Sequence, residues 1–286
     1  MPIRPEAVIT VARDQGRLKI TVEPQTNRQL ALEDLADGVA SIHIWQALGW
    51  QEVIQRYRRS YLGPFWLTLS TGIMVGVMGP LYSKLFKLDM ASYFPYLAVS
   101  MVLWQTISQV AQDSSNVFIA AEGYIKQVKL PYSVYVLRLV WKNLIVLMHN
   151  LVIVLLVILY FRPPLGYALF LFPIALFLFA ANAVWVGIVL GMVCARFRDM
   201  PLIVTSLMQV AFFLTPIMWQ PQMLGRYRWV VNLNPLYHVL ETMRAPLTGT
   251  AIEPIPWIFV PCMTVLGYVL MFAFYSRFRA RIAYWI

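Results

Sequence analysis

The chain has 286 residues, of which 60% are hydrophobic and 13% charged, and its 23 Lys and Arg against 13 Asp and Glu give a formal net charge of +10. Soluble domains carry about 25% charged and about 45–50% apolar residues, so the composition argues against a soluble enzyme. The 16 Phe, 10 Trp and 15 Tyr exclude a disordered chain. A multi-spanning membrane protein is left, and there Lys and Arg gather on cytoplasmic loops rather than on a nucleic-acid surface.

Residues 1–40 differ from the rest of the chain and are expected to form a short N-terminal cytoplasmic segment. Ala7–Ala12 and Leu18–Val22 are short runs of β-type composition on either side of Arg13-Asp14-Gln15-Gly16. Two such runs around a turn predict a small β-hairpin. No apolar stretch near Met1 resembles a cleavable signal peptide.

Residues 41–63 predict an amphipathic helix directly before the first long apolar run. Apolar residues recur at helical spacing from Ile42 to Tyr57, and Gln, Glu and Arg occupy the other side. A helix that carries Trp on one face and Arg at its end is expected to lie in the membrane interface. The alternative is an ordinary solvated helix that packs on a partner.

Six long uncharged stretches follow, and a run of about 20 apolar residues is enough to cross a bilayer. The sequence therefore predicts an all-α membrane protein with a six-helix transmembrane domain over residues 64–286. The stretches are Phe65–Ser83, Tyr93–Gln112, about Leu139–Phe161, one within Pro163–Ala195, one within Met200–Gln220, and Pro254–Ser276.

An even number of spans puts both termini on one side of the membrane. With that side cytoplasmic, 11 near-membrane Lys and Arg lie inside and 6 lie outside. This bias agrees with the positive-inside rule and predicts cytoplasmic termini. Arg138 and Lys142 share one helix face in the third span, where each would cost about 2.5–3.5 kcal/mol at the bilayer centre. We expect the hydrocarbon core to begin near Asn143, with both cations reaching the cytoplasmic interface; a polar conduit is the alternative.

Motifs for soluble chemistry are missing from the sequence. There is no G-x-x-x-x-G-K-[ST], G-x-G-x-x-G or H-E-x-x-H, and the three His and two Cys are scattered. Acids are nearly absent from the spans, which argues against a proton relay. The glycine pairs Gly72/Gly76 and Gly187/Gly191 allow close helix contact, either between two copies or within one chain.

Two short elements interrupt the apolar pattern. The first is a tight charged turn, Arg196-Phe197-Arg198-Asp199, on the predicted cytoplasmic side. The second is the amphipathic region from Thr215 to Gly249, between the fifth and sixth spans. There Asn234 and Pro235 predict a helix start, and Glu241 and Arg244 are spaced to pair. Such a region suits re-entrant or gate helices on the outer side.

These segments together resemble the permease subunits of ABC-2 type exporters, in particular those that export O-antigen and related cell-surface polysaccharides. The resemblance runs from about Ile42 to Ile286. It is carried, in this order, by RYRRSYLGPFW at 56–66, VKLP at 128–131, RFRD at 196–199, FLTPI at 213–217, and NPL at 234–236 with Glu241 and Arg244.

The resemblance implies a homodimer in the bacterial inner membrane, bound to two copies of a separate ABC ATPase subunit. ATP and Mg would be held by that partner, so no cofactor or metal is expected in this chain. The chain itself would be a transport subunit rather than an enzyme. The residues implied to couple it to the ATPase are Arg56, Arg58, Arg59, Glu122, Lys126, Arg196, Phe197, Arg198 and Asp199.

The implied substrate is a lipid-linked polysaccharide that passes through a conduit between the two protomers. Because sugars stack their C–H faces on aromatic rings, the candidate lining residues are Trp66, Tyr93, Tyr96, Trp104, Phe212, Phe213 and Trp219. The same rings also suit an interfacial belt or a packed core. The implied outer gate comprises Asn234, Pro235, Glu241 and Arg244.

Other functions stay open on the sequence. Capsule or teichoic-acid polymers are the nearest alternative substrates, and drug or lipid export by a related permease is further away. A membrane-embedded enzyme acting on polyprenyl-linked sugars needs a catalytic acid pair or a phosphate site near the membrane surface, for which the few acids are too scattered. A purely structural membrane protein is the last alternative.

Overall fold

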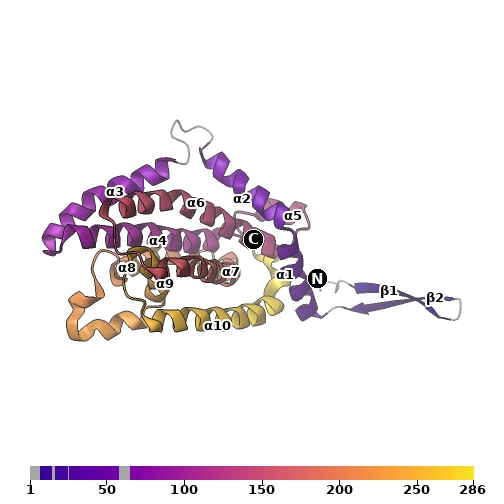
Figure 1. Ribbon diagram of the computed structural model, residues 1–286. Helices are drawn as coiled ribbons and strands as arrows, with labels where there is room; N and C mark the ends of the chain where they lie inside the picture. Colours follow the sequence, from indigo (N-terminus) through magenta and orange to yellow (C-terminus); the bar gives the residue numbers. More distant parts are fainter. Residues whose placement is uncertain (1–6, 15–16, 25, 58–64) are drawn as a thin grey trace.

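Long helices make up most of the chain (Figure 1). The computed structural model describes residues 7–14, 17–24, 26–57 and 65–286. The α-helices are α1 (Asn27–Ala40), α2 (Ile42–Tyr57), α3 (Phe65–Leu85), α4 (Met90–Asn116), α5 (Glu122–Gln127), α6 (Tyr132–Phe161), α7 (Phe172–Arg196), α8 (Met200–Leu214), α9 (Pro235–Thr248), α10 (Pro254–Phe278) and α11 (Ile282–Trp285). Short 3-10 segments are η1 (Tyr167–Leu171), η2 (Pro221–Leu233) and η3 (Arg279–Arg281).

A two-stranded hairpin precedes the helices. Strand β1 (Ala7–Asp14) pairs antiparallel with β2 (Arg17–Pro24), with Ala7 opposite Pro24. Figure 1 shows this hairpin extending away from the helices. Helix α1 then begins with a capping box, in which Thr26 and Gln29 bond each other's backbone N–H groups.

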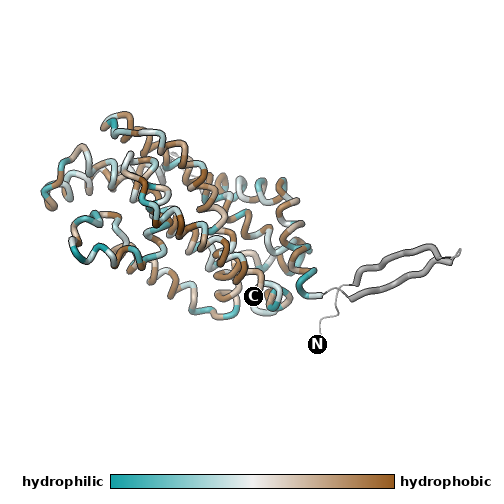
Figure 2. Tube along the Cα trace, turned by 60° about the horizontal axis from the view of Figure 1, so that its bottom comes forward, coloured by the Kyte–Doolittle hydropathy of each residue, from teal (hydrophilic) through white to brown (hydrophobic). Residues whose placement is uncertain are grey.

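Three of the described helical segments are long and apolar enough to cross a membrane. They are Tyr132–Phe161, Tyr167–Arg196 and Pro254–Trp285, and α8 is a shorter apolar helix. Figure 2 shows hydrophobic residues along much of these helices and hydrophilic ones near many of their ends. The expected helical membrane fold is confirmed to this extent.

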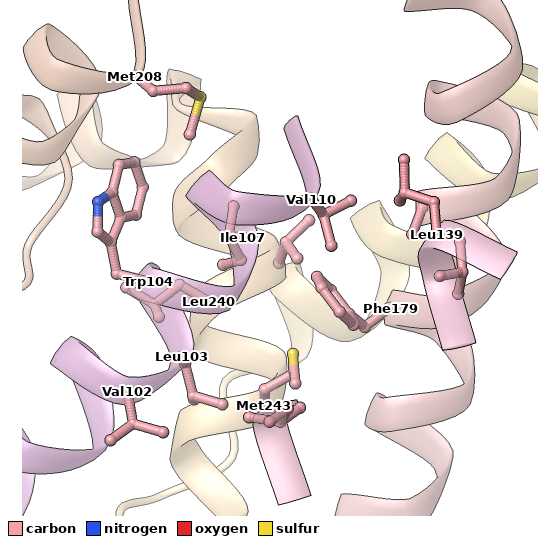
Figure 3. Packing of buried hydrophobic residues seen from close by; sticks show 14 of the residues in the cluster. Val102, Leu103, Trp104, Ile107, Val110, Leu139, Phe179, Met208, Leu240 and Met243 are labelled. Carbon is pink, nitrogen blue, oxygen red and sulfur yellow. The ribbon is translucent and has the colours of Figure 1, made fainter. Parts of the chain in front are cut away.

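Helix α4 is the centre of the bundle. It packs against α3, α6, α7, α8 and α9, and it is buried almost continuously from Tyr93 to Ile107. Figure 3 shows Trp104 of α4 next to Met208 of α8, and both residues line one cavity. The core therefore lies around α4 rather than between two equal layers.

The glycines of α7 allow α7 to approach its neighbours closely. A Cβ on Gly187 would lie 2.6 Å from Val136 of α6, and one on Gly191 would lie 2.5 Å from Val117, just after α4. Both glycines thus serve packing within the chain. In contrast, nothing lies within 4 Å of a Cβ built on Gly76 of α3.

Helix α2 packs against α6 of the same chain. Trp45 meets Trp141 edge to face with their ring centroids 6.0 Å apart. A Cβ on Gly49 would lie only 3.0 Å from the carbonyl oxygen of Arg138. One face of α2 is therefore packed on α6.

Helix α1 is held by a single buried carboxylate, Asp34. It accepts hydrogen bonds from the backbone N–H groups of Tyr132 (2.9 Å) and Ser133 (3.1 Å), at the start of α6. The Tyr275 hydroxyl (2.6 Å) and Arg279 Nε (3.0 Å) donate from the other end of the chain. A negative charge is favourable at a helix N-terminus, so this contact joins α1, α6 and the end of α10.

Candidate functional site

A polar stripe on α4 forms the wall of an open cavity. Gln105, Ser108, Gln109 and Gln112 recur at helical spacing, which places them on one face of an otherwise apolar helix. This face borders a cavity of about 360 Å³ between α3, α4 and α8. The cavity is lined by Ser70, Thr71, Met74, Met101, Trp104, Gln105, Ser108, Gln109, Gln112 and Phe212.

A second cavity of about 350 Å³ continues the first along α8. The two share Trp104, Ser108, Gln112 and Phe212, and the second adds Phe213 of α8 among other residues. The rings of Trp104 and Phe212 lie 6.1 Å apart, and those of Phe212 and Phe213 lie 5.2 Å apart. We call these two joined cavities the polar groove.

Hydrogen bonds fix the amides of the groove. Thr71 of α3 donates to Gln105 Oε1 at 2.8 Å, and Gln112 Nε2 donates to Ser108 Oγ at 2.9 Å. The lining residues are neutral amides, hydroxyls, rings and methionines, without a charged side chain among those that line either cavity in the described chain. Such a surface suits a neutral ligand that presents hydroxyl groups and C–H faces.

The remaining aromatic candidates lie elsewhere. The hydroxyl of Tyr93 donates to the Met218 carbonyl at 2.6 Å, and that of Tyr96 donates to the Pro216 carbonyl at 2.8 Å. Trp219 donates its Nε1–H to a carbonyl of α8 at 3.2 Å. Trp66, in the first turn of α3, is 56% exposed and does not line the polar groove.

The predicted helix start at Asn234 and Pro235 is present. The Asn234 side chain accepts from the N–H groups of Leu236 and Tyr237 and caps α9, with Pro235 as its first residue. Its Nδ2 also donates to Thr215 Oγ1 at 2.9 Å. The cap therefore ties α9 to the segment that follows α8.

The predicted pairing of Glu241 with Arg244 is confirmed, and the pair is buried. Arg244 also donates to the Pro216 carbonyl at 2.6 Å and to Ser100 Oγ at 2.9 Å, and its guanidinium stacks 4.3 Å from the ring centre of Tyr96. All of α9 from Tyr237 to Thr248 is buried, whereas the sequence indicated an amphipathic segment. The ion pair is what allows two charges to lie inside.

Arg138 and Lys142 face neighbouring helices of the bundle; their predicted place at the cytoplasmic interface stays a prediction. Their side chains are only 11% and 15% exposed, and each pairs with an acid of a neighbouring helix. The acids are Glu52 of α2 and Asp113 of α4. Paired charges can be retained inside a bundle, so these ion pairs lower the cost of both cations at either depth.

The candidate coupling residues of α5 and of the turn between α7 and α8 are on the surface. Lys126 Nζ lies 2.6 Å from Glu122 Oε1, and this hydrogen bond lowers the pKa of the Glu122 carboxyl below its usual value. The positive charge of Arg198 lowers that pKa further, since the two segments are neighbours. Arg198 and Asp199 are exposed.

Arg196 holds the same turn against the C-terminal segment. Its guanidinium lies 5.4 Å from the ring centres of both Phe197 and Trp285. Arg56 is in the last turn of α2, but its side chain is outside the described part of the structure. Arg58 and Arg59 lie outside the described residues altogether.

Sequence reasoning missed several of these polar residues. The stripe on α4 lies in a stretch that the sequence marks as an uncharged span, and only the structure shows that it borders a cavity. Asp34 and Glu52 gave no signal, because one acid in a mixed segment has no distinctive spacing. Within the described part of the chain, no group of three His, Cys, Asp or Glu is placed to hold a metal ion.

Comparison with known proteins points to one family. Residues 43–248 match the model of the ABC-2 type transporter family. An O-antigen export system permease protein RfbA from Klebsiella pneumoniae is 24% identical over 196 residues, which cover 66% of this chain and 74% of that protein. A second RfbA permease from the same species is 22% identical over 234 residues, which cover 80% of this chain and 89% of that protein.

Proposed function

Because the chain belongs to the ABC-2 type transporter family, we propose that it is the permease of an ATP-driven exporter that moves a lipid-linked polysaccharide, O-antigen, across the bacterial inner membrane. As a permease it is a transport component rather than an enzyme. The substrate part of the proposal draws on the two permeases that are named for O-antigen export.

The polar groove is the observation that carries this proposal. Amides and hydroxyls at membrane depth are costly unless they face protein, water or a polar ligand. The groove combines them with the rings of Trp104, Phe212 and Phe213. A sliding glycan needs many weak contacts with rings and neutral hydrogen-bonding groups, and a groove of this composition provides them.

The proposed topology has six spans with both termini cytoplasmic. Asp34 and Arg279 are hydrogen-bonded to each other at 3.0 Å, so the residues before α3 and after α10 lie on the same side of the bilayer. This requires an even number of crossings between α3 and α10. The three most apolar helical segments of the described chain give an odd number, so further helices must cross as well. Helices α3, α4 and α8 bring the proposed total to six.

The proposed assembly is a homodimer with two ATPase subunits. The polar groove is open on one side, and a second copy facing it would close a conduit. The exposed ion pair of Glu122 with Lys126 and the exposed Arg198 and Asp199 lie on neighbouring segments and supply a surface for the ATPase. ATP-driven closure of the ATPases would then act on the bundle through these segments.

The proposal is tested in cells that lack their own O-antigen permease but retain the polymer and the ATPase. The chain is expected to restore surface O-antigen and to co-purify with the ATPase after detergent extraction. Phe213→Ala, at a groove-lining ring that is 71% exposed, is expected to lower surface polymer about two- to tenfold, as for losing one ring contact of about 0.5–1.5 kcal/mol. Phe177→Ala, on the exposed side of α7, is the matched control.

Several outcomes would contradict the proposal. Restored export of capsule or teichoic acid but not of O-antigen would reassign the substrate within the family. Purification without any ATPase would remove the ATP-driven mechanism. Equal effects of the Phe213 and Phe177 variants would show that the groove does not carry the polymer.

A further inference from the structure

Four charged side chains from three helices meet where α2, α4 and α6 pack together. Lys142 Nζ lies 2.7 Å from Asp113 Oδ2 and 3.6 Å from Glu52 Oε2, and Arg138 lies 3.1 Å from the other oxygen of Glu52. Two positive and two negative charges balance in this cluster. Lys142 is the side chain that contacts both an acid of α2 and an acid of α4.

Asp113 connects this charge cluster to the polar groove. Its carboxylate accepts hydrogen bonds from Gln109 Nε2 at 2.8 Å and from Asn143 Nδ2 at 2.9 Å. An ionised carboxylate only accepts, so Gln109 must direct its NH₂ group toward Asp113. Gln109 also lines the groove. The charge on Asp113 thereby fixes the orientation of one amide in the groove wall.

Glu52 connects the cluster to the other side. It lies on α2, whose Gly49 touches α6 beside Arg138 and whose Trp45 packs on Trp141. A displacement of α2 along α6 therefore changes the distance from Glu52 to Lys142. Because one ammonium group, that of Lys142, contacts two carboxylates, Glu52 and Asp113 compete for it.

We propose that Lys142 is a positioning residue that couples α2 to the polar groove through Asp113 and Gln109. This inference rests on the proposed function, in which α2 lies before the first span and the groove carries the polymer. When Glu52 moves away, Lys142 binds Asp113 alone and Gln109 is held; when Glu52 moves closer, the hold on Asp113 loosens. The groove wall thus responds to the position of α2.

The test uses the complete complex of permease and ATPase, purified into lipid vesicles, with lipid-linked O-antigen from the same cells as the probe. The variants are Lys142→Met, Lys142→Arg and Glu52→Gln, and Lys84→Met is the control because Lys84 is exposed at the end of α3. Two quantities are measured, namely the stimulation of ATP hydrolysis by the polymer and the ATP hydrolysed per polymer exported.

We expect Lys142→Met to assemble with unchanged basal hydrolysis and to lose at least about fivefold of the polymer stimulation, the lower end for coupling between two sites. Lys142→Arg retains the positive charge and should recover most of the polymer stimulation of ATP hydrolysis. Glu52→Gln should raise the ATP used per polymer while leaving the buried pair of Lys142 with Asp113 intact. Lys84→Met should behave like the parent chain.

The inference is overturned if Lys142→Met and Glu52→Gln both keep parental stimulation and stoichiometry. If Lys142→Met does not assemble, Glu52→Gln alone decides, since Glu52 is one-third exposed and is not a core residue. A parent complex that shows neither export nor stimulation contradicts the proposed function instead. The two failures are therefore distinguishable.

Discussion

At the scale of single residues, Asp34 is the strongest structural contact outside the groove. Its side chain is fully buried and accepts five hydrogen bonds from α6, Tyr275 and Arg279. Asp34→Asn keeps the shape but removes the charge and turns one donor toward other donors. We expect Asp34→Asn to lower the free energy of unfolding by about 2–4 kcal/mol. This is less than the about 5 kcal/mol that breaking a fully buried ion pair can cost, because Arg279 is partly exposed.

The measurement is the apparent melting temperature of the detergent-solubilised permease. Asp37→Asn is the matched control, because Asp37 lies on the same helix and is exposed. The role given to Asp34 is wrong if both variants melt at the same temperature.

At the scale of elements, α9 and the segment 215–219 form one unit. Arg244 bonds the Pro216 carbonyl, Ser100 and Glu241 at once, and Tyr96 donates to the same carbonyl. Lys cannot replace this planar set of donors, because its ammonium is a point charge. We expect Arg244→Lys to raise the amide exchange of residues 217–219 by about tenfold or more, as for losing at least one charged hydrogen bond of about 1.5–3 kcal/mol.

Hydrogen–deuterium exchange of the solubilised protein reads this out directly. Arg226→Lys is the control, because Arg226 is exposed on η2 and its guanidinium contacts the neighbouring Tyr227. Unchanged protection of residues 217–219 in Arg244→Lys would mean that packing, not Arg244, holds the segment.

The helices themselves were largely predictable from the sequence. Long apolar runs located α3, α4, α6, α7, α8 and α10, and Asn234 with Pro235 located the start of α9. The burial of α9 on all sides was not predictable, because Arg244 also bonds Ser100 and the Pro216 carbonyl, which are distant in sequence. The same holds for α2: its pattern indicated one apolar face, but not that α6 covers it.

The candidate site divides in the same way. Trp104, Phe212 and Phe213 were named from the substrate that the resemblance implies and line the groove, whereas Tyr93 and Tyr96, named on the same ground, bond to carbonyls. Whether a ring faces a cavity depends on the helix rotation, which tertiary contacts set. Arg138 and Lys142 show the same limit, since their acids come from other helices.

At the scale of the whole molecule, the shape of the groove constrains how two copies would meet. Helices α3 and α8 form its two edges on either side of α4. In a two-fold symmetric pair with the grooves facing each other, α3 of one copy meets α8 of the other, because the axis exchanges the edges. Both edges carry exposed groove-lining residues at mid-helix, Met74 on α3 and Gln209 on α8.

This arrangement predicts a cross-link between copies. Cys194 and Cys262 are first replaced by Ser, and cysteines are then introduced as Met74→Cys and Gln209→Cys. In native membranes a short thiol-reactive linker should join two chains into a covalent dimer. The Met74→Cys, Val269→Cys pair is the control, since Val269 is also exposed but lies on α10, away from the groove. Dimer formation by the control pair at the same yield would mean that the grooves do not face each other, and the polar face of α4 would then need another cover.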